Sequence, residues 1–128
     1  MKTLALVIAS VFTLLAFGNA YAHGDHEARH GGTVGVGNDE IVVEFVMEKG
    51  TLNLYVHDET GKPLSIENLR GTFTLIAPQR PAQEVKLVAA GEGKFKAPGI
   101  APVRGDWMVA RITLPGGEET ESAALFAE

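Results

Sequence analysis

The stretch IVVEFVMEKGTLNLYVH, residues 41–57, decides the fold. Large apolar side chains occupy every second position over 41–47 and again over 52–56, which is the period of strands with one buried face. A two-residue turn at Lys49-Gly50 would join the two strands as a hairpin. In that register inward residues face inward residues, as a correct pairing requires. We expect Glu48 opposite Thr51, Met47 opposite Leu52, Phe45 opposite Leu54 and Val43 opposite Val56.

Further short strands are expected around this hairpin, separated by turns that contain Gly and Pro. Many short strands with closely spaced turns are typical of a sandwich, so we predict an all-β domain of about seven short antiparallel strands. Only Ile66 to Arg70 reads as a helical turn. The further strands are expected at Thr33 to Gly37, Thr72 to Ala77, Glu84 to Ala89, Lys94 to Ala97, Trp107 to Leu114 and Thr120 to Phe126.

Three large side chains are expected in or near the core. Met47 and Met108 fall on the inward faces of their strands and should fill it. Trp107 begins a strand at a place where a sandwich often buries a tryptophan, and a binding platform is the weaker alternative.

Composition excludes several classes of protein. The chain has 128 residues, of which 45% are apolar, and it has no cysteine. This length fits one small domain without a disulfide scaffold or a thiolate metal site. The net charge is −5, from 11 basic and 16 acidic residues, so we expect no nucleic-acid partner.

The first 22 residues have the features of a signal peptide. Lys2 precedes an apolar run from Leu4 to Phe17, and Ala20-Tyr21-Ala22 is a cleavage signal. The apolar run is shorter than the roughly 20 residues that a spanning helix needs. We therefore predict an exported, periplasmic protein that does not insert in the membrane after the signal peptide is removed.

The four histidines carry the one chemical signal. His23, His26 and His30 lie within residues 23–32, which have no large apolar side chain and should form a flexible tail before a domain at 33–128. Such a tail can wrap a cation and become ordered on binding. Imidazole suits copper, zinc and nickel, and among divalent ions Cu(II) binds such sites most tightly. We expect Cu(II) as the ion, with Zn(II) as the alternative.

The cleavage site affects the ligand set. A cut after Ala22 makes His23 the first residue, whose amine and ring nitrogen can chelate copper together as a histidine brace. A cut after Ala20 places His23 third, so that the amine, two amides and the imidazole can form a square-planar set. His57 lies on the outward face of its strand with Glu44 as a diagonal neighbour, and Asp58 is adjacent. These three could lend ligands to the tail, although a solvated histidine at a strand end is the simpler interpretation of His57.

Several short motifs stand out: His30-Gly31-Gly32-Thr33-Val34, Glu44-Phe45-Val46, Leu54-Tyr55-Val56, Asp58 with Gly61-Lys62-Pro63, and Gly105-Asp106-Trp107. They resemble a family of small exported domains that occur beside heavy-metal efflux and copper-resistance systems. The resemblance covers most of residues 30–114 and implies an immunoglobulin-like β-sandwich with a role in periplasmic metal handling. A CopC-like site would use His23 as the N-terminal ligand, with any of the other three histidines as the second. Gly105-Asp106-Trp107, followed by alternating apolar residues, is similar to the closing part of YtkA-like and CopC-like sandwiches.

Three functions are compatible with these observations. The first is a periplasmic metal-binding protein that buffers or delivers an ion, with an efflux or resistance protein of the envelope as partner. The second is a non-enzymatic envelope interaction module whose histidines are incidental. The third, a copper oxygenase, ranks last because the short chain leaves little room for a substrate cleft. We therefore expect no catalytic residues, and His23, His26, His30 and His57 are the candidate metal ligands.

Overall fold

The structure is a computed structural model that describes residues 27–37 and 41–127. The predicted signal peptide, 1–22, and two of the candidate ligands, His23 and His26, lie outside the described residues. Within these two ranges, no helix has the length and apolar character needed to cross a membrane.

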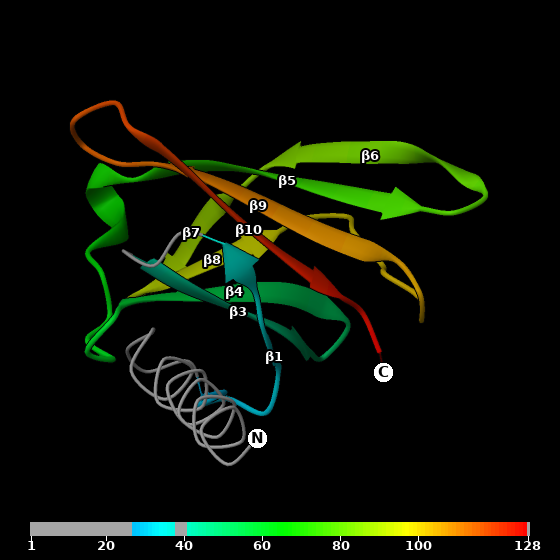
Figure 1. The fold of residues 1–128 in the computed structure, drawn as a ribbon, viewed down its shortest axis with the longest axis horizontal. Helices are drawn as coiled ribbons and strands as arrows, with labels where there is room; N and C mark the ends of the chain where they lie inside the picture. Colours follow the sequence, from blue (N-terminus) through cyan, green and yellow to red (C-terminus); the bar gives the residue numbers. More distant parts are fainter. Residues whose placement is uncertain (1–26, 38–40, 128) are drawn as a thin grey trace, which may run out of the picture.

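The described residues form ten strands in two antiparallel sheets, which make the two layers of a sandwich (Figure 1). Sheet A has the strand order β1-β3-β4-β8-β7, and sheet B has the order β2-β10-β9-β5-β6. The predicted all-β sandwich is therefore confirmed. The elements are β1 (Thr33–Val34), β2 (Val36–Gly37), β3 (Ile41–Glu48), β4 (Thr51–Asp58), the 3-10 turn η1 (Ile66–Asn68), β5 (Arg70–Ala77), β6 (Arg80–Lys86), β7 (Val88–Gly91), β8 (Lys94–Ala97), β9 (Trp107–Thr113) and β10 (Glu119–Leu125).

The hairpin of β3 and β4 has the register expected from the sequence. Glu48 lies opposite Thr51, and the inward pairs Met47–Leu52, Phe45–Leu54 and Val43–Val56 follow along the ladder. Lys49 and Gly50 both have positive φ angles, of 51° and 79°. Two positive angles define the type I′ turn, whose twist matches that of the strands it connects. Local sequence thus sets this part of sheet A.

The described residues form ten strands, more than the expected number of about seven. The sequence placed eight strands by position, and two of those eight each divide between the sheets. Residues 33–37 split at Gly35, so that β1 pairs with β3 in sheet A and β2 pairs with β10 in sheet B. A Cβ atom at Gly35 would collide with the Ser122 side chain and press on the Phe45 ring, so the crossing requires glycine. Residues 84–89 divide in the same way at Leu87, between β6 and β7.

Apart from the central strand β4, the strand order resembles that of an immunoglobulin-like sandwich. If β4 is set aside, the order β1-β3-β8-β7 corresponds to the A-B-E-D sheet of such domains. The order β10-β9-β5-β6 corresponds to G-F-C-C′. The strand β4 lies between β3 and β8 and widens sheet A, which gives it a larger outward surface.

The core lies between the sheets and joins them through large apolar side chains. Phe45 of sheet A meets Phe73 of sheet B edge to face, with ring centroids 6.3 Å apart. Met108 is buried and Met47 packs against the same core, as expected. The expected burial of Trp107 is wrong, since 48% of this residue is exposed. Successive side chains of a strand point to opposite faces, so the inward position of Met108 turns Trp107 outward.

Candidate metal-binding face

The outward face of sheet A carries the two candidate histidines that the structure describes. Glu44 lies opposite Tyr55, and Val42 lies opposite His57, so His57 and Glu44 are diagonal neighbours, as the sequence predicted. This face is unusually enclosed for the outside of a sandwich. Glu44 is fully buried, and His57 has only 4% of its surface exposed.

Glu44 binds the chain segment that precedes β1. Its Oε1 accepts a hydrogen bond from the backbone N–H of Arg29, at 2.9 Å. Its Oε2 accepts bonds from the N–H groups of His30, at 2.9 Å, and Gly32, at 2.8 Å. One buried carboxylate therefore satisfies three backbone donors. It fastens residues 29–32, the end of the predicted tail, to the outward face of the sheet.

The same hydrogen bonds determine the ionisation of Glu44. Burial by itself would raise the pKa of this carboxyl. The hydrogen bonds from the His30 side chain and from the N–H groups of Arg29, Gly32 and His30 outweigh that effect, and the net pKa lies below the ordinary value of 4.5. Glu44 is therefore charged at neutral pH, which strengthens each of these bonds.

His30 is held in a fixed orientation by two contacts. Its Nδ1 lies 3.0 Å from Oε1 of Glu44. Its ring stacks on that of Tyr55, with centroids 3.6 Å apart and planes inclined by only 9°. The side chain keeps 39% exposure. Since Glu44 engages Nδ1, the ring nitrogen that is left to meet a ligand is Nε2.

Tyr55 links His30 to a polar cluster farther along the sheet. The Tyr55 hydroxyl donates a hydrogen bond to Oε1 of Glu48 at 2.7 Å, and Asn53 donates to the same oxygen at 2.8 Å. Nζ of Lys94 lies 3.8 Å from that oxygen and 5.4 Å from the centre of the Tyr55 ring. The hydrogen bond to Glu48, burial and the negative charges of Glu48 and Glu44 together raise the pKa of Tyr55 to about 12.

This pKa can be measured directly on protein that begins at His23, in which Tyr55 is the only tyrosine. We expect the ultraviolet absorbance of the phenolate to appear with a midpoint near pH 12, and we expect Glu48→Gln to lower the midpoint toward 10.0. Circular dichroism at each pH serves as the control that the protein remains folded. An unchanged midpoint in Glu48→Gln would show that Glu48 does not hold the tyrosine proton.

His57 is buried, contrary to the expectation that it would be solvated. The loop after β4 returns beside the end of this strand. Pro63 pairs with His57 as an isolated bridge, and Leu64 donates a hydrogen bond to the carbonyl of Val56 at 3.1 Å. The carboxylate of Asp58 stabilises this loop by accepting hydrogen bonds from Thr60 and Lys62. Asp58 is thus occupied within its own loop.

The two ring nitrogens of His57 have different surroundings. Nδ1 lies 2.7 Å from the carbonyl oxygen of Asp58, an acceptor, so Nδ1 carries the proton in the neutral ring. Nε2 is then a bare acceptor. It is fully buried and has no hydrogen-bond partner among the described residues. A buried polar atom in this state costs about 1–3 kcal/mol, which calls for a physical explanation.

The structure places the candidate ligands as follows. His30 and His57 both lie on the outward face of sheet A, and the Tyr55 ring against which His30 stacks belongs to the residue two positions before His57. In the part of the chain that the structure describes, no three His, Cys, Asp or Glu side chains gather around one point. A complete ligand set would therefore need His23 or His26, which lie outside that part.

Sequence reasoning did not foresee the structural role of Glu44. A single charged residue interrupts the apolar run of 41–47, and this was the available signal. The role of Asp106 was not foreseen either. Asp106 is buried, and it accepts hydrogen bonds from Arg80 at 2.6 Å and from the N–H of Val103 at 2.9 Å. These bonds fix the turn before β9. Asp106 belongs to the Gly105-Asp106-Trp107 motif, and its role here is structural.

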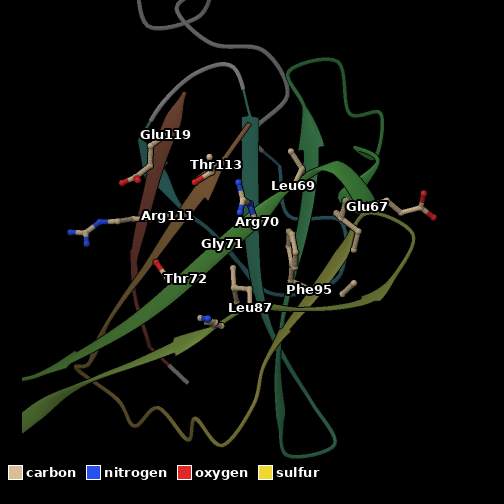
Figure 2. A pocket seen from close by; sticks show the side chains of 13 residues that line it. Glu67, Leu69, Arg70, Gly71, Thr72, Leu87, Phe95, Arg111, Thr113 and Glu119 are labelled. Carbon is tan, nitrogen blue, oxygen red and sulfur yellow. The ribbon is translucent and has the colours of Figure 1, made fainter. Parts of the chain in front are cut away.

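A cleft of about 510 Å³ lies in a different part of the molecule, beside η1 and the start of β5 (Figure 2). Leu69, Leu87 and Phe95 form its apolar part. Arg70 also lines it, but so do acidic residues such as Glu119, so the charge of its lining does not select one class of ligand. None of the described residues that line this cleft is a histidine, and none of them is Glu44, Glu48 or Tyr55.

Comparisons with family models, with curated proteins and with solved structures found no match to this chain. The resemblance to YtkA-like and CopC-like domains therefore stays a prediction.

Proposed function

We propose that this protein is a periplasmic, non-enzymatic metal-binding protein that holds Cu(II) on the outward face of sheet A. Zn(II) is the alternative ion. The protein would buffer the ion or deliver it to an efflux or resistance protein of the envelope. The observation that carries this proposal is the buried, unpartnered Nε2 atom of His57.

The surroundings of His57 are compatible with a role as a metal ligand. Histidines that bind metals almost always donate their second ring N–H to a carbonyl or carboxylate oxygen, which fixes the ring and its tautomer. His57 has this arrangement with the Asp58 carbonyl. A metal ion on Nε2 would offset the cost of leaving that nitrogen without a partner. Imidazole nitrogen is a preferred ligand of Cu(II) and Zn(II).

His30 supports the proposal independently. Its Nδ1 is anchored by the carboxylate of Glu44, which leaves Nε2 for a ligand, as in a carboxylate–histidine–metal arrangement. Arg29 is fastened to the same face by its backbone. His26 comes three residues earlier, so the chain keeps it within about 11 Å of the Arg29 backbone even when fully extended. The proposed set is therefore His57 and His30, completed by His26 or His23.

The test is a titration of the purified exported protein with Cu(II) and Zn(II), after its N-terminus has been fixed by intact mass. The control is a synthetic peptide of residues 23–32, which has the three tail histidines but lacks His57 and Glu44. We expect one equivalent of Cu(II) to bind the protein at least about tenfold more tightly than the peptide. Equal affinities would contradict the proposal and favour an interaction module with incidental histidines.

The affinity should also depend on pH. An imidazole nitrogen binds a metal only when it is unprotonated, so the affinity should fall as the pH drops below about 6.5. The same titration at pH 7.5 and pH 5 measures this change. Equal affinities at the two pH values would point to carboxylate ligands in place of histidine.

A further inference from the structure

A continuous apolar patch lies on the outward face of sheet B, on the opposite side of the sandwich from His30 and His57. Leu125, Trp107 and Ile76 lie directly opposite one another on β10, β9 and β5. Val36 of β2 extends the patch through Ala123, its partner on β10. We call Val36, Ile76, Trp107 and Leu125 the Trp107 patch.

These four side chains are exposed although they are large and apolar. Their exposed fractions are 83% for Val36, 46% for Ile76, 48% for Trp107 and 44% for Leu125. Inward residues of the same strands, such as Leu75, Met108 and Ala124, fill the core, so alternation holds the patch outward. Scattered exposed apolar residues need no explanation, but a contiguous group on one sheet face marks a contact surface.

The charges around the patch indicate what covers it. The chain has a net charge of −5, so two copies repel each other in most orientations. Sheet B is an exception, because its basic and acidic side chains balance once Arg80 is paired with buried Asp106. The remaining charged residues of β5, β6, β9 and β10 are three basic and three acidic: Arg70, Lys86, Arg111, Glu84, Glu119 and Glu121.

The position of the patch suits a two-fold contact. Trp107 begins β9, Leu125 ends β10 and Ile76 is the penultimate residue of β5, so the patch occupies one end of the face. The charged row of Glu121, Arg111, Thr72 and Lys86 crosses the sheet farther along. Two copies related by a two-fold axis would bring patch onto patch and leave these charges at the rim, as in other interfaces.

We propose that the Trp107 patch is the contact surface of a homodimer, in which the B sheets of two copies pack face to face. Packed sheets interdigitate their side chains at a spacing of about 10 Å. Four patch residues provide less area than the roughly 800 Å² per partner of a standard stable interface. The dimer is therefore weak and concentration-dependent, with Trp107 at its centre, where aromatic residues contribute most.

The single tryptophan of the chain provides a direct test. Fluorescence emission and sedimentation mass are measured for the purified exported protein from about 1 μM to about 1 mM. We expect the emission of Trp107 to move to shorter wavelength as the mass rises from monomer to dimer, because association removes the ring from water. A monomeric mass with constant emission over the whole range would overturn the proposal.

Two variants test whether the Trp107 patch forms the contact between the two copies. The double variant Ile76→Ser, Leu125→Ser keeps the tryptophan as the probe, and we expect it to weaken association at least about tenfold. Its thermal unfolding checks that it folds. Val88→Ser is the matched control, since Val88 is 43% exposed but belongs to β7 of sheet A. Association that survives the double variant, or that Val88→Ser weakens equally, would place the contact elsewhere and overturn the assignment.

Discussion

Replacing His57 with asparagine is expected to lower the affinity for Cu(II) at least about tenfold while the sandwich stays folded. The asparagine amide can take the place of Nδ1 and donate to the carbonyl of Asp58, which His57 meets at 2.7 Å. It has no atom in the place of Nε2. The variant therefore removes the proposed ligand atom and keeps the hydrogen bond that orients the side chain.

Thermal unfolding separates a loss of metal binding from a loss of fold. A ligand that binds only the folded state raises the unfolding temperature as its concentration increases. Cu(II) should therefore stabilise the wild-type protein and have little effect on His57→Asn. The unfolding temperature of each protein with a chelator present is the reference from which its stabilisation by Cu(II) is measured. A His57→Asn variant that binds Cu(II) as tightly as the wild type would show that His57 is not a ligand.

Replacing Glu44 with glutamine is expected to cost about 2–3 kcal/mol of unfolding free energy at pH 7. Both carboxylate oxygens of Glu44 accept hydrogen bonds, from Arg29 and His30 on one side and from His30 and Gly32 on the other. Glutamine offers one oxygen, and its NH₂ group would face backbone donors. Denaturation by urea measures the loss, and faster hydrogen exchange at the N–H groups of 29–32 would show that this segment has detached.

Glu48→Gln is the matched control for that experiment. Glu48 lies on the same strand and the same face as Glu44, but its side chain is 41% exposed. Removing a charge from such a site should cost less than about 1 kcal/mol. Equal losses in the two variants would contradict the role assigned to Glu44.

The loss of unfolding free energy caused by Glu44→Gln should become smaller as the pH falls. Because folding lowers the pKa of Glu44, its contribution is fully present above the unfolded value near 4.5 and is lost as the pH falls through the folded value. The difference in stability between wild type and variant should therefore be constant around neutrality and shrink in acid. A difference that grows below pH 4.5 would show that the carboxylate is not stabilised by folding.

Glu44 also shows why the outward face of sheet A could be predicted only in part from the sequence. An isolated charge in the apolar run of 41–47 is visible in the sequence, and so are the histidines of 23–30. Which donors meet the carboxylate is not visible, because they lie 12 to 15 positions earlier in the chain. Their approach depends on the pairing of β1 with β3, which is a contact between distant segments.

The predicted burial of Trp107 and the predicted exposure of His57 were wrong for different reasons. The inward position expected for Met108 already required Trp107 to point outward, so a strict use of strand alternation would have corrected that prediction. His57 is different. Alternation placed it on the outward face correctly, but alternation does not say whether an outward side chain is covered by other segments of the chain.

The sequence by itself determined the features that depend on neighbouring residues. These are the alternation of 41–48 and 51–57, the Lys49-Gly50 turn and the register of their hairpin, since strand period and turn geometry act over a few positions. Only the tertiary structure decided where 33–37 and 84–89 divide between the sheets, what Glu44 binds, and that His57 is enclosed with a bare nitrogen. Those features arise where distant segments meet, and the free energy of each such contact depends on partners that no local pattern specifies.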